Sequence, residues 1–434
     1  MIPNITTALS APLLELESLF LDSSTEIERW FREQWRDKMP PFYGSVDLRN
    51  AGYKLAPVDM NLFPGGFNNL SPVFLPLCVQ AAQAAVERLC PSANRLLLVP
   101  ENHTRNRFYL QNVARLATIL RLTGLEVRIG SLLPEISEAT TLMLDDGASL
   151  TLEPLVREGN QLGVAGFKPC AVLLNNDLSA GVPEILQGLD EQWLIPPLHT
   201  GWHTRRKSRH AAVYERVARN FSEVIGIDPW HICPDFRVCG DIDFHERAGE
   251  ECLATQVDAL LTDIRSNYRR RGISDEAFVV VKADAGTYGM GIMMVKDASE
   301  VIGLNRRQRN KMAVVKEGLA VEEVIIQEGV RTFEMVDSAA AEPVLYMMDH
   351  YVVGGFYRVH TARGSDENLN APGMEFRPMP FDSPCCMPDC QQGPDAAPNR
   401  LYAYGVVARL ALLAASIEIE EADPAVARPG VNLS

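Results

Sequence analysis

A glycine-rich loop between two apolar strands is the feature that most constrains how this chain folds. The segment VVVKADAGTYGMGIMMV (279–295) predicts a β-strand that carries Lys282, a loop with three glycines in six residues, and a second strand. Glycine allows positive φ and lets backbone N–H groups approach an anion closely. The loop is not a Walker A motif, because no GK[ST] follows, nor a dinucleotide-binding motif, because it leads into a strand. Two interpretations stay open: a hairpin that covers an anionic ligand, or a glycine-rich hairpin without one.

Polar residues are unusually dense in GSVDLRNAGYKLAPVDMNLFPGGFNNL (44–70), which predicts two strands and a glycine turn. Asp47 lies on the first strand, and Asp59 and Asn61 form a D-x-N pattern on the second. Residues two apart on a strand point to the same side of a sheet, so Asp59 and Asn61 can meet one metal ion, and Asp47 can complete the set. Carboxylate and amide oxygens are the ligands that Mg²⁺ prefers. The alternative is that these are polar residues of a hairpin and its turn.

The composition restricts the class of ligand and the compartment. The formal net charge of −15 argues against general nucleic-acid binding, although the basic segment TRRKSRH (204–210) allows a small anionic ligand. No apolar run is long enough to predict a membrane span, and the N-terminus lacks the basic region of a signal peptide. Nine cysteines without framework spacing suit a reducing compartment. We expect a soluble, cytoplasmic protein whose partners are small molecules, not nucleic acid or membrane, with no prediction of its oligomeric state.

Strands that alternate with helices predict an α/β fold in three parts. We expect residues 1–91 to supply a helix and two strands, residues 92–200 to form a small doubly wound α/β domain, and residues 201–434 to form the domain with the glycine loop. The expected helices span 12–37, 72–89, 207–225, 251–271, 304–317 and 400–417, and 94–130 is expected to form a strand–helix–strand unit.

Several local features refine this outline. The segment PVLYMMDHYVVGGFYRVH (343–360) predicts a β-hairpin with Gly354 and Gly355 near its turn, and the acids that follow Ile417 predict a solvated end. The motif ENHTRNRFY places His103 and Arg105 just beyond a strand of the small domain, where ligands often bind. The motif CCMPDC (385–390) lacks a second Cys or His pair at zinc spacing and is expected to be a loop.

The order of motifs resembles that of ATP-grasp ligases, in which a strand lysine and a glycine hairpin clamp a nucleotide. The resemblance implies that Lys282 contacts the ATP phosphates and that Arg358, in GGFYRVH, points at the transferred phosphate as a second catalytic residue. It implies that the nucleotide is also bound by the glycine loop, the hinge strand VIIQEGV, the start of a helix and an asparagine loop; the matching residues are Gly286, Thr287, Tyr288, Gly289, Gly291, Gln327, Glu328, Val330, Lys207 and Asn368. Each motif alone also fits a plain strand or a solvated basic helix end.

The metal ligands of ATP-grasp enzymes come from strands near the C-terminus, and this chain stops too soon to supply them. We therefore expect a circularly permuted, ATP-grasp-like fold, in which Asp47, Asp59 and Asn61 come from the N-terminal strands and join the same sheet.

The segments 40–70, 201–210 and 279–295 together make the chain similar to a small bacterial class of glutamate–cysteine ligases over almost its whole length. That resemblance implies an ADP-forming enzyme that uses ATP and Mg²⁺ to join L-glutamate and L-cysteine through a γ-glutamyl phosphate, the first step of glutathione synthesis. Residues beside the proposed metal strands are candidates to hold the amino acid carboxylates: Arg49, Asn50, Lys54, Asn68 and Asn69. The alternatives are a glutathione-synthetase-like or other amino-acid ligase, and a non-catalytic nucleotide-binding protein.

Overall fold

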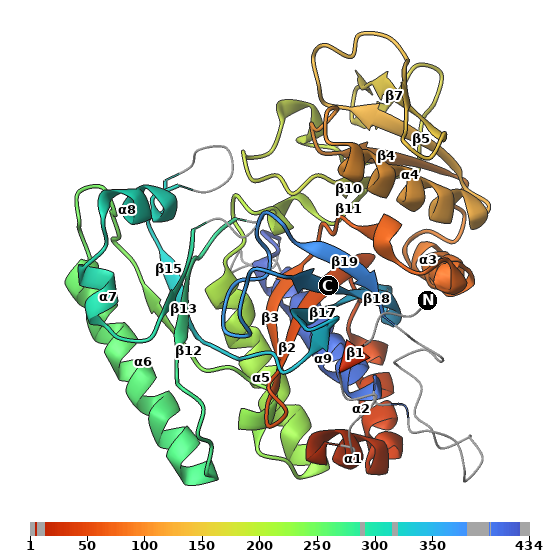
Figure 1. Cartoon of the computed structure of the whole chain (residues 1–434). Coiled ribbons are helices and arrows are strands. Elements are labelled where there is room, and N and C mark those ends of the chain that lie inside the picture. The colour runs from red at the N-terminus through yellow and green to blue at the C-terminus, as the bar shows by residue number, and fades with distance from the viewer. Residues whose placement is uncertain are drawn as a thin grey trace.

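The protein is built from three groups of strands, each with its own helices (Figure 1). The computed structural model describes residues 5–6, 14–286, 291–314, 320–379, 399 and 401–425. A large sheet lies in the centre, an α/β unit lies beside it, and a small antiparallel sheet is covered by the long helix α6 (Glu250–Arg271). The predicted α/β class is confirmed.

The large sheet joins strands from the two ends of the chain. Strand β17 (Ala339–Met348) pairs with β18 (Tyr351–His360) on one edge and with β2 (Tyr43–Asn50) on the other, and β2 pairs with β3 (Leu55–Asn61). The remaining strands are β1 (Ile5–Thr6), β16 (Met335–Val336) and β19 (Glu375–Pro378). The prediction that the N-terminal strands join the sheet of the C-terminal part is therefore confirmed.

Alternation along β2 divides its polar and apolar residues between the two faces of this sheet. Val46 and Leu48 belong to the core beneath helix α9 (Tyr402–Ala422), while Asp47 and Arg49 point to the opposite face. Strands β17 and β18 follow the same rule and place Glu342 and Arg358 on the polar face. The polar density of the N-terminal segment is thus one face of a buried sheet.

Helix α9 is apolar and long enough to cross a membrane, and it is the only such helix in the described part of the chain. Of its apolar window, 89% is buried in the protein, against β2, β3 and α5 (Lys207–Ile225). It is therefore the core helix of the large sheet.

Helix α9 also extends five residues beyond the predicted end at 417, and Glu418 is buried in an ion pair with Arg205. The prediction of a solvated end after Ile417 was wrong for Glu418, because this buried arginine, far away in sequence, neutralises the acid.

The other helices of this region largely follow their predictions. The helix expected over 12–37 is two helices, α1 (Glu15–Asp22) and α2 (Ser24–Asp37), which meet at Ser23. Helix α3 (Leu75–Leu89) follows two short 3₁₀ turns at Phe67–Asn69 and Pro72–Phe74. Helix α5 has the predicted bounds and ends at Gly226, whose φ of 73° is typical of a glycine that terminates a helix.

The α/β unit contains the predicted strand–helix–strand pattern, as β4 (Arg95–Pro100), α4 (Arg107–Leu122) and β5 (Glu126–Ser131). Its six-stranded sheet has the order β11–β10–β4–β5–β7–β6, in which all pairs except β6–β7 are parallel. The other strands are β6 (Thr140–Met143), β7 (Ser149–Pro154), β10 (Ala171–Asn175) and β11 (Trp193–Ile195), with a separate hairpin of β8 (Val156–Glu158) and β9 (Gln161–Gly163). The exact domain boundaries stay a prediction. Short 3₁₀ turns lie at Glu184–Leu186, Leu198–Thr200 and Pro229–His231.

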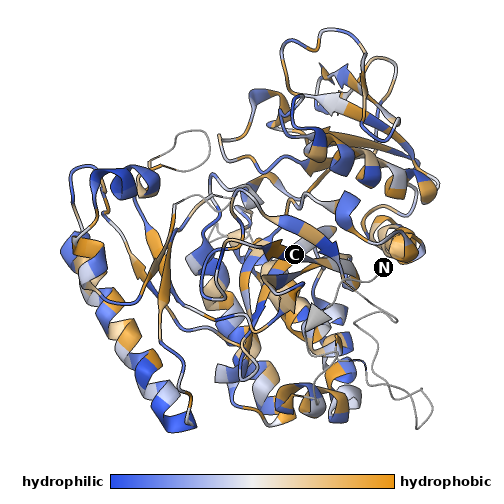
Figure 2. Cartoon of the chain, in the orientation of Figure 1, coloured by the Kyte–Doolittle hydropathy of each residue, from blue (hydrophilic) through white to orange (hydrophobic). Residues whose placement is uncertain are grey.

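The small sheet contains the two strands that flank the glycine loop. Its order is β12 (Phe236–Cys239), β15 (Val324–Glu328), β13 (Val279–Ala283) and β14 (Ile292–Val295), all antiparallel. Figure 2 shows mixed hydrophilic and hydrophobic residues along α6, which packs one apolar side on this sheet. Two short helices complete this part, α7 (Ser299–Ile302) and α8 (Arg306–Met312). The described part of the helix expected over 304–317 is α8, while 315–319 and CCMPDC (385–390) lie outside the described residues.

The turn of the β17–β18 hairpin differs from its prediction. The chain reverses at Asp349 and His350, between the paired residues Met348 and Tyr351, and Asp349 has a φ of 51°. Gly354 instead lies at the register shift beyond the turn, with a φ of 146°, a conformation that disfavours other residues. A β-bulge and a turn both favour glycine, so the sequence pattern alone does not distinguish the two.

A buried ion pair joins the loop between β2 and β3 to the small sheet. Lys54 Nζ lies 2.5 Å from Glu328 Oε2, and the side chains are 1% and 0% exposed. The amine also lies 4.4 Å from the ring centroid of Trp230. Burial raises the pKa of the Glu328 carboxyl although Lys54 opposes this shift. The carboxylate therefore depends on Lys54 to remain charged inside the protein.

Replacing Lys54 by Met should destabilise the fold strongly, because it leaves a buried carboxylate without its counter-ion, a loss of about 3–5 kcal/mol. We expect thermal unfolding to begin at least about 5 °C lower, and the double variant Lys54→Met/Glu328→Gln to recover much of this loss. Lys168→Met, which removes an exposed ion pair with Glu158, is the matched control. A double variant less stable than Lys54→Met would contradict this interpretation.

Candidate functional site

Two cavities meet on the polar face of the large sheet. The first, of about 750 Å³, lies between this sheet and the small sheet, and the second, of about 1290 Å³, lies between the large sheet and the α/β unit. Asp47, Asp59, Arg358 and Asn370 line both cavities. A group held in the first cavity can therefore meet a group held in the second at these residues.

A chain of buried ion pairs fixes Arg358 at this junction. Its Nη1 lies 2.7 Å from Asp47 Oδ2 and 2.6 Å from Glu342 Oε1, and Glu342 Oε2 lies 2.5 Å from Arg49 Nε. Burial raises the pKa of the Asp47 carboxyl, with Glu342 and Asp59 adding to the shift and Arg358 opposing it. The pKa of Arg358 is raised by Asp47 and Glu342, which outweigh its burial. The guanidinium thus stays charged at the junction of the cavities.

Glu342 was missed by sequence reasoning, although it binds both arginines of this network. The only local signal is one acid in the apolar strand AAAEPVLYMM. Burial would raise the pKa of Glu342, but Arg49 and Arg358 outweigh it and lower the pKa. The role of Glu342 becomes visible only when β2 and β18 lie on either side of β17.

Asp59 is held by the first residue of α5. Lys207 Nζ lies 2.8 Å from Asp59 Oδ1, and the helix start is tied to the small sheet because Asp284 accepts hydrogen bonds from the Lys207 and Ser208 backbone N–H groups. Burial alone would raise the pKa of Asp59, but Lys207 and Lys282 outweigh it and bring the pKa to about 2. The predicted positioning of Lys207 by a helix start agrees with this geometry, which also depends on Asp284, a residue that the sequence did not single out.

The basic segment that contains Lys207 is paired rather than solvated. Arg205 donates to both carboxylate oxygens of Glu418 and to the carbonyl of Met60. The ring of Trp202 lies 4.4 Å from Lys207 Nζ. This segment therefore joins β3, α5 and α9, and the interpretation as a solvated basic helix end was wrong for Arg205 and Lys207.

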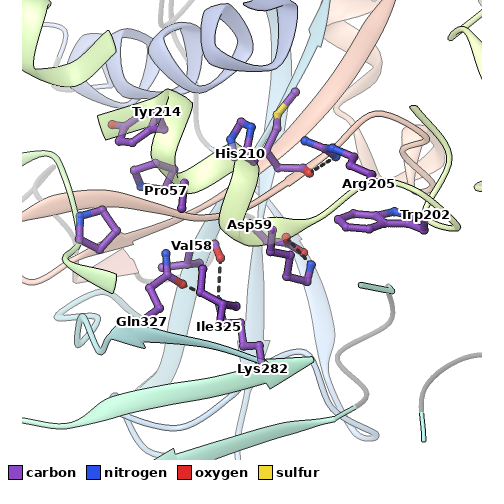
Figure 3. A pocket seen from close by; sticks show the side chains of 14 residues that line it. Pro57, Val58, Asp59, Trp202, Arg205, His210, Tyr214, Lys282, Ile325 and Gln327 are labelled. Atoms are coloured by element: carbon purple, nitrogen blue, oxygen red, sulfur yellow. Dashed lines mark hydrogen bonds and ion pairs between the residues drawn. The ribbon is translucent and has the colours of Figure 1, made fainter. Parts of the chain in front are cut away.

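Lys282 lies between the two sheets, in the space that Figure 3 shows. Its Nζ donates to the carbonyl of Val58 and to Gln327 Oε1, both at 2.7 Å. Burial lowers the pKa of the Lys282 amine to about 8, although Asp59 opposes the shift. An anion bound next to this amine would oppose the effect of burial and raise its pKa again. The cavity drawn in Figure 3 is a smaller one, and Lys282 lines it together with Trp202 and Tyr214.

The predicted nucleotide residues gather around the first cavity. Gln327, Glu328, Val330, Gly286, Lys207 and Asn368 line it together with Lys282. Its apolar wall is formed by Phe278, Val280, Ile292 and Met294. Gly291 and Asn368 line a neighbouring hollow, and Thr287, Tyr288 and Gly289 lie outside the described residues. The first cavity thus combines an apolar side with a charged part, in which Lys207 and Lys282 lie near Asp59.

The predicted substrate residues separate into three groups. Asn68 and Asn69 line the second cavity, and Arg49 lines the first. Lys54 lines neither cavity, because it is engaged with Glu328, and Asn50 points to the opposite face, where its amide donates to Tyr404. The positions of Asn50 and Lys54 support structural roles rather than contact with a substrate.

The predicted metal ligands lie close together on the sheet. Asp47 and Asp59 are directly opposite each other in the β2–β3 register, and Asn61 lines the second cavity with them. The side-chain oxygen of Asn61, Oδ1, already accepts a hydrogen bond from the backbone N–H of Phe63 at 2.9 Å. In the described residues no group of three or more His, Cys, Asp or Glu side chains is placed to hold a metal ion. Two carboxylates remain, which fit a Mg²⁺ ion whose other ligands are phosphate oxygens and water.

Comparisons with known proteins identify the family to which the chain belongs. The family model GshA, glutamate-cysteine ligase, matches residues 17–419. The chain is similar to a protein from Methylobacillus flagellatus KT that is described as a proposed gamma-glutamylcysteine synthetase. The two sequences are 65% identical, and the crystal structure of that protein matches with a TM-score of 0.89. The match covers 98% of this chain and 100% of that one.

The match to a glutathione synthetase-like effector from Globodera pallida covers 80% of each chain, with 10% sequence identity and a TM-score of 0.40. No curated protein matches the chain. The family model and the 65% identical structure are sufficient: the chain belongs to the glutamate–cysteine ligase family of ATP-dependent enzymes.

Proposed function

We propose that the protein binds ATP in the first cavity and both amino acids in the second, and joins the γ-carboxyl of L-glutamate to the amine of L-cysteine through a γ-glutamyl phosphate. The observation that carries this proposal is that Arg358, Asp47 and Asp59 line both cavities. Phosphoryl transfer depends on positioning and on the cancellation of negative charge. A shared wall with a fixed guanidinium meets both needs.

In this proposal the adenine lies against the apolar side of the first cavity. The hinge residues Gln327, Glu328 and Val330 also line this cavity, and we place the phosphates beside Lys207 and Lys282. Arg358 then faces the phosphoryl group as it moves toward the glutamate γ-carboxylate, and its charge stabilises the transition state. The guanidinium is held by Asp47 and Glu342, so its orientation costs no reorganisation during the reaction.

Asp47 and Asp59 would hold Mg²⁺, since both carboxylates border the phosphate end of the cavity and the ion prefers oxygen ligands. The bound ion supplies positive charge to the phosphate oxygens. In this proposal the chain itself holds the γ-carboxylate and the acyl phosphate at Arg358, where the two cavities meet. The neutral cysteine amine then attacks the acyl carbon: the C–N bond forms, the C–O bond to the phosphate breaks, and the proton lost from nitrogen leaves with the phosphate.

We further propose that the enzyme works in the cytoplasm. The cysteines of the described residues are free thiols: Cys78, Cys90, Cys170, Cys233, Cys239 and Cys252. Free thiols suit a reducing compartment, where the substrate cysteine is also kept reduced.

The purified protein should release ADP and phosphate when it is given ATP, L-glutamate and L-cysteine. We expect Arg358→Lys, which keeps the charge but loses the fork that binds Asp47 and Glu342, to lower kcat by about 100-fold or more. Arg377→Lys, an exposed change on β19, is the matched control. ADP release with γ-glutamylcysteine and glycine instead would identify a glutathione-synthetase-like enzyme, and ATP binding without turnover would identify a non-catalytic protein.

Asp59→Asn tests the proposed metal ligand. The variant loses one of two carboxylates for Mg²⁺, so we expect the Mg²⁺ concentration for half-maximal activity to rise about 10-fold or more and kcat to fall. The exposed Asp263→Asn serves as control. Unchanged Mg²⁺ dependence and turnover in Asp59→Asn would exclude this role.

The affinity for ATP should depend on the protonation of Lys282. Its pKa in the free protein is about 8, below the ordinary value of a lysine, and ATP favours the protonated amine. Binding of a non-hydrolysable ATP analogue should therefore weaken as the pH rises above 8, by up to about tenfold per pH unit. Calorimetry between pH 7.5 and about 9.5 measures this slope. Lys282→Arg stays charged and should flatten the slope; the same slope in this variant would show that another group causes it.

A further inference from the structure

Two cysteines lie side by side behind the small sheet. Cys239 is the last residue of β12, and Cys252 lies in the first turn of α6. Their Sγ atoms are 3.0 Å apart. Neither cysteine is among the described residues that line the first or the second cavity. The pair is therefore separate from the proposed reaction site.

The loop between β12 and α6 folds back on itself and brings the two cysteines together. The N–H of Asp243 donates to the carbonyl of Ala248 at 3.1 Å. Gly249 has a φ of 78°, and a Cβ atom at this position would lie 2.7 Å from Ile242 Cδ1 and 2.9 Å from the Asp241 carbonyl oxygen. This close approach requires glycine. The first turn of α6 is thus held against the end of β12.

The distance between the two sulfurs suits a disulfide bond. An S–S bond is about 2.0 Å long, so a small rotation of the side chains closes the remaining gap of about 1 Å. The other four cysteines of the described residues lie next to oxygen atoms instead, namely Cys78, Cys90, Cys170 and Cys233. The Cys239–Cys252 pair is therefore the one that the described part of the chain prepares for oxidation.

Exposure gives the two thiols different roles. Cys252 is exposed, whereas Cys239 is 3% exposed. The free N–H groups in the first turn of a helix favour a thiolate there. Of the two acids in this turn, Glu250 is paired with Arg247 and Glu251 is exposed to solvent. Burial and the adjacent Cys252 raise the pKa of the Cys239 thiol to about 12. Cys252 is therefore the thiol that meets an oxidant first.

We propose that Cys239 and Cys252 form a reversible disulfide bond, with a low-molecular-weight disulfide as the oxidant. The Cys252 thiolate attacks one sulfur of the oxidant, a mixed disulfide forms, and the other half of the oxidant leaves as a thiolate. Cys239 then attacks the Cys252 sulfur, and its proton passes to the second half, which leaves as a thiol. The protein loses two electrons, and the oxidant is reduced to two thiols. Disulfides of cytosolic proteins are usually transient and redox-sensing, so the bond forms only when such an oxidant accumulates.

The bond would stabilise the part of the protein that contains the hinge strand. It closes the segment 239–252 into a loop, which restricts the unfolded chain. Cys239 pairs with Val324 on β15, the strand that ends at Glu328. The cross-link therefore fastens α6 to the sheet that lines the first cavity. This inference does not depend on the proposed function.

Oxidation of the reduced protein with glutathione disulfide tests the proposal. We expect two of its nine thiols to be lost, and trypsin digestion to give peptides 238–247 and 248–265 joined by a disulfide bond. Cys239→Ala should stop at the mixed disulfide on Cys252, and Cys252→Ser should show neither product. Cys90→Ser is the matched control and should keep the cross-link. Dithiothreitol should restore both thiols.

Thermal unfolding tests the stabilising effect. Oxidised wild type should unfold about 2 °C or more above the reduced protein, and Cys252→Ser should show no such rise. Far-UV circular dichroism of each variant checks its folding. Separate peptides, or a mixed disulfide that persists on Cys252 of the wild type, would overturn the disulfide. A cross-link without a rise in unfolding temperature would overturn the stabilising role. Both measurements are independent of turnover, so they fail or succeed separately from the proposed function.

Discussion

The ion pairs between Arg358, Asp47, Glu342 and Arg49 are the interaction on which the rest of the site depends. They join β18 and β17 from the C-terminal part of the chain to β2 from the N-terminal part. Burying one such charge without a partner costs several kcal/mol, so the alternation of two bases and two acids is what allows all four to lie inside the protein. The network also fixes the register in which Asp47 faces Val344 and Asp59 faces Asp47. One buried network thus closes the sheet and positions the guanidinium between the cavities.

The pairing of distant segments also explains what the sequence can predict. Local signals were sufficient for α5, whose bounds were predicted correctly, because a glycine ends it and its apolar stripe has the helical period. Period-two alternation likewise placed Asp59 and Asn61 on one face, and the resemblance to ATP-grasp ligases predicted that the N-terminal strands join the sheet. These inferences needed only the order of residues along one element or the resemblance to a family.

The errors have the opposite character. Glu342 and Glu418 are acids whose roles depend on Arg49 and Arg205, which are 293 and 213 residues away in sequence. Lys54 lies in a polar segment of the kind that binds substrates, but its ion pair with Glu328 keeps its amine away from the cavity surface. Whether a charged side chain contacts a ligand or completes an internal pair depends on which strand lies next to its own, and a local pattern carries no record of that neighbour. The site could therefore be predicted as a region more reliably than residue by residue.

The internal ion pairs of the site also determine which interactions change when a nucleotide binds. Without ligands, Lys207 neutralises Asp59 and Arg358 neutralises Asp47. Both bases border the phosphate end of the first cavity, and both acids are the proposed Mg²⁺ ligands. In the proposed complex, the phosphates pair with the bases and the divalent cation pairs with the acids. No charge is therefore left without a partner when the internal ion pairs loosen. Lys282 follows the same rule, because burial lowers its pKa despite Asp59, and the added charge of a bound phosphate would raise it. The charges that stabilise the sheet are therefore the same charges that we propose for binding the nucleotide, and they lie where strands from the two ends of the chain pair.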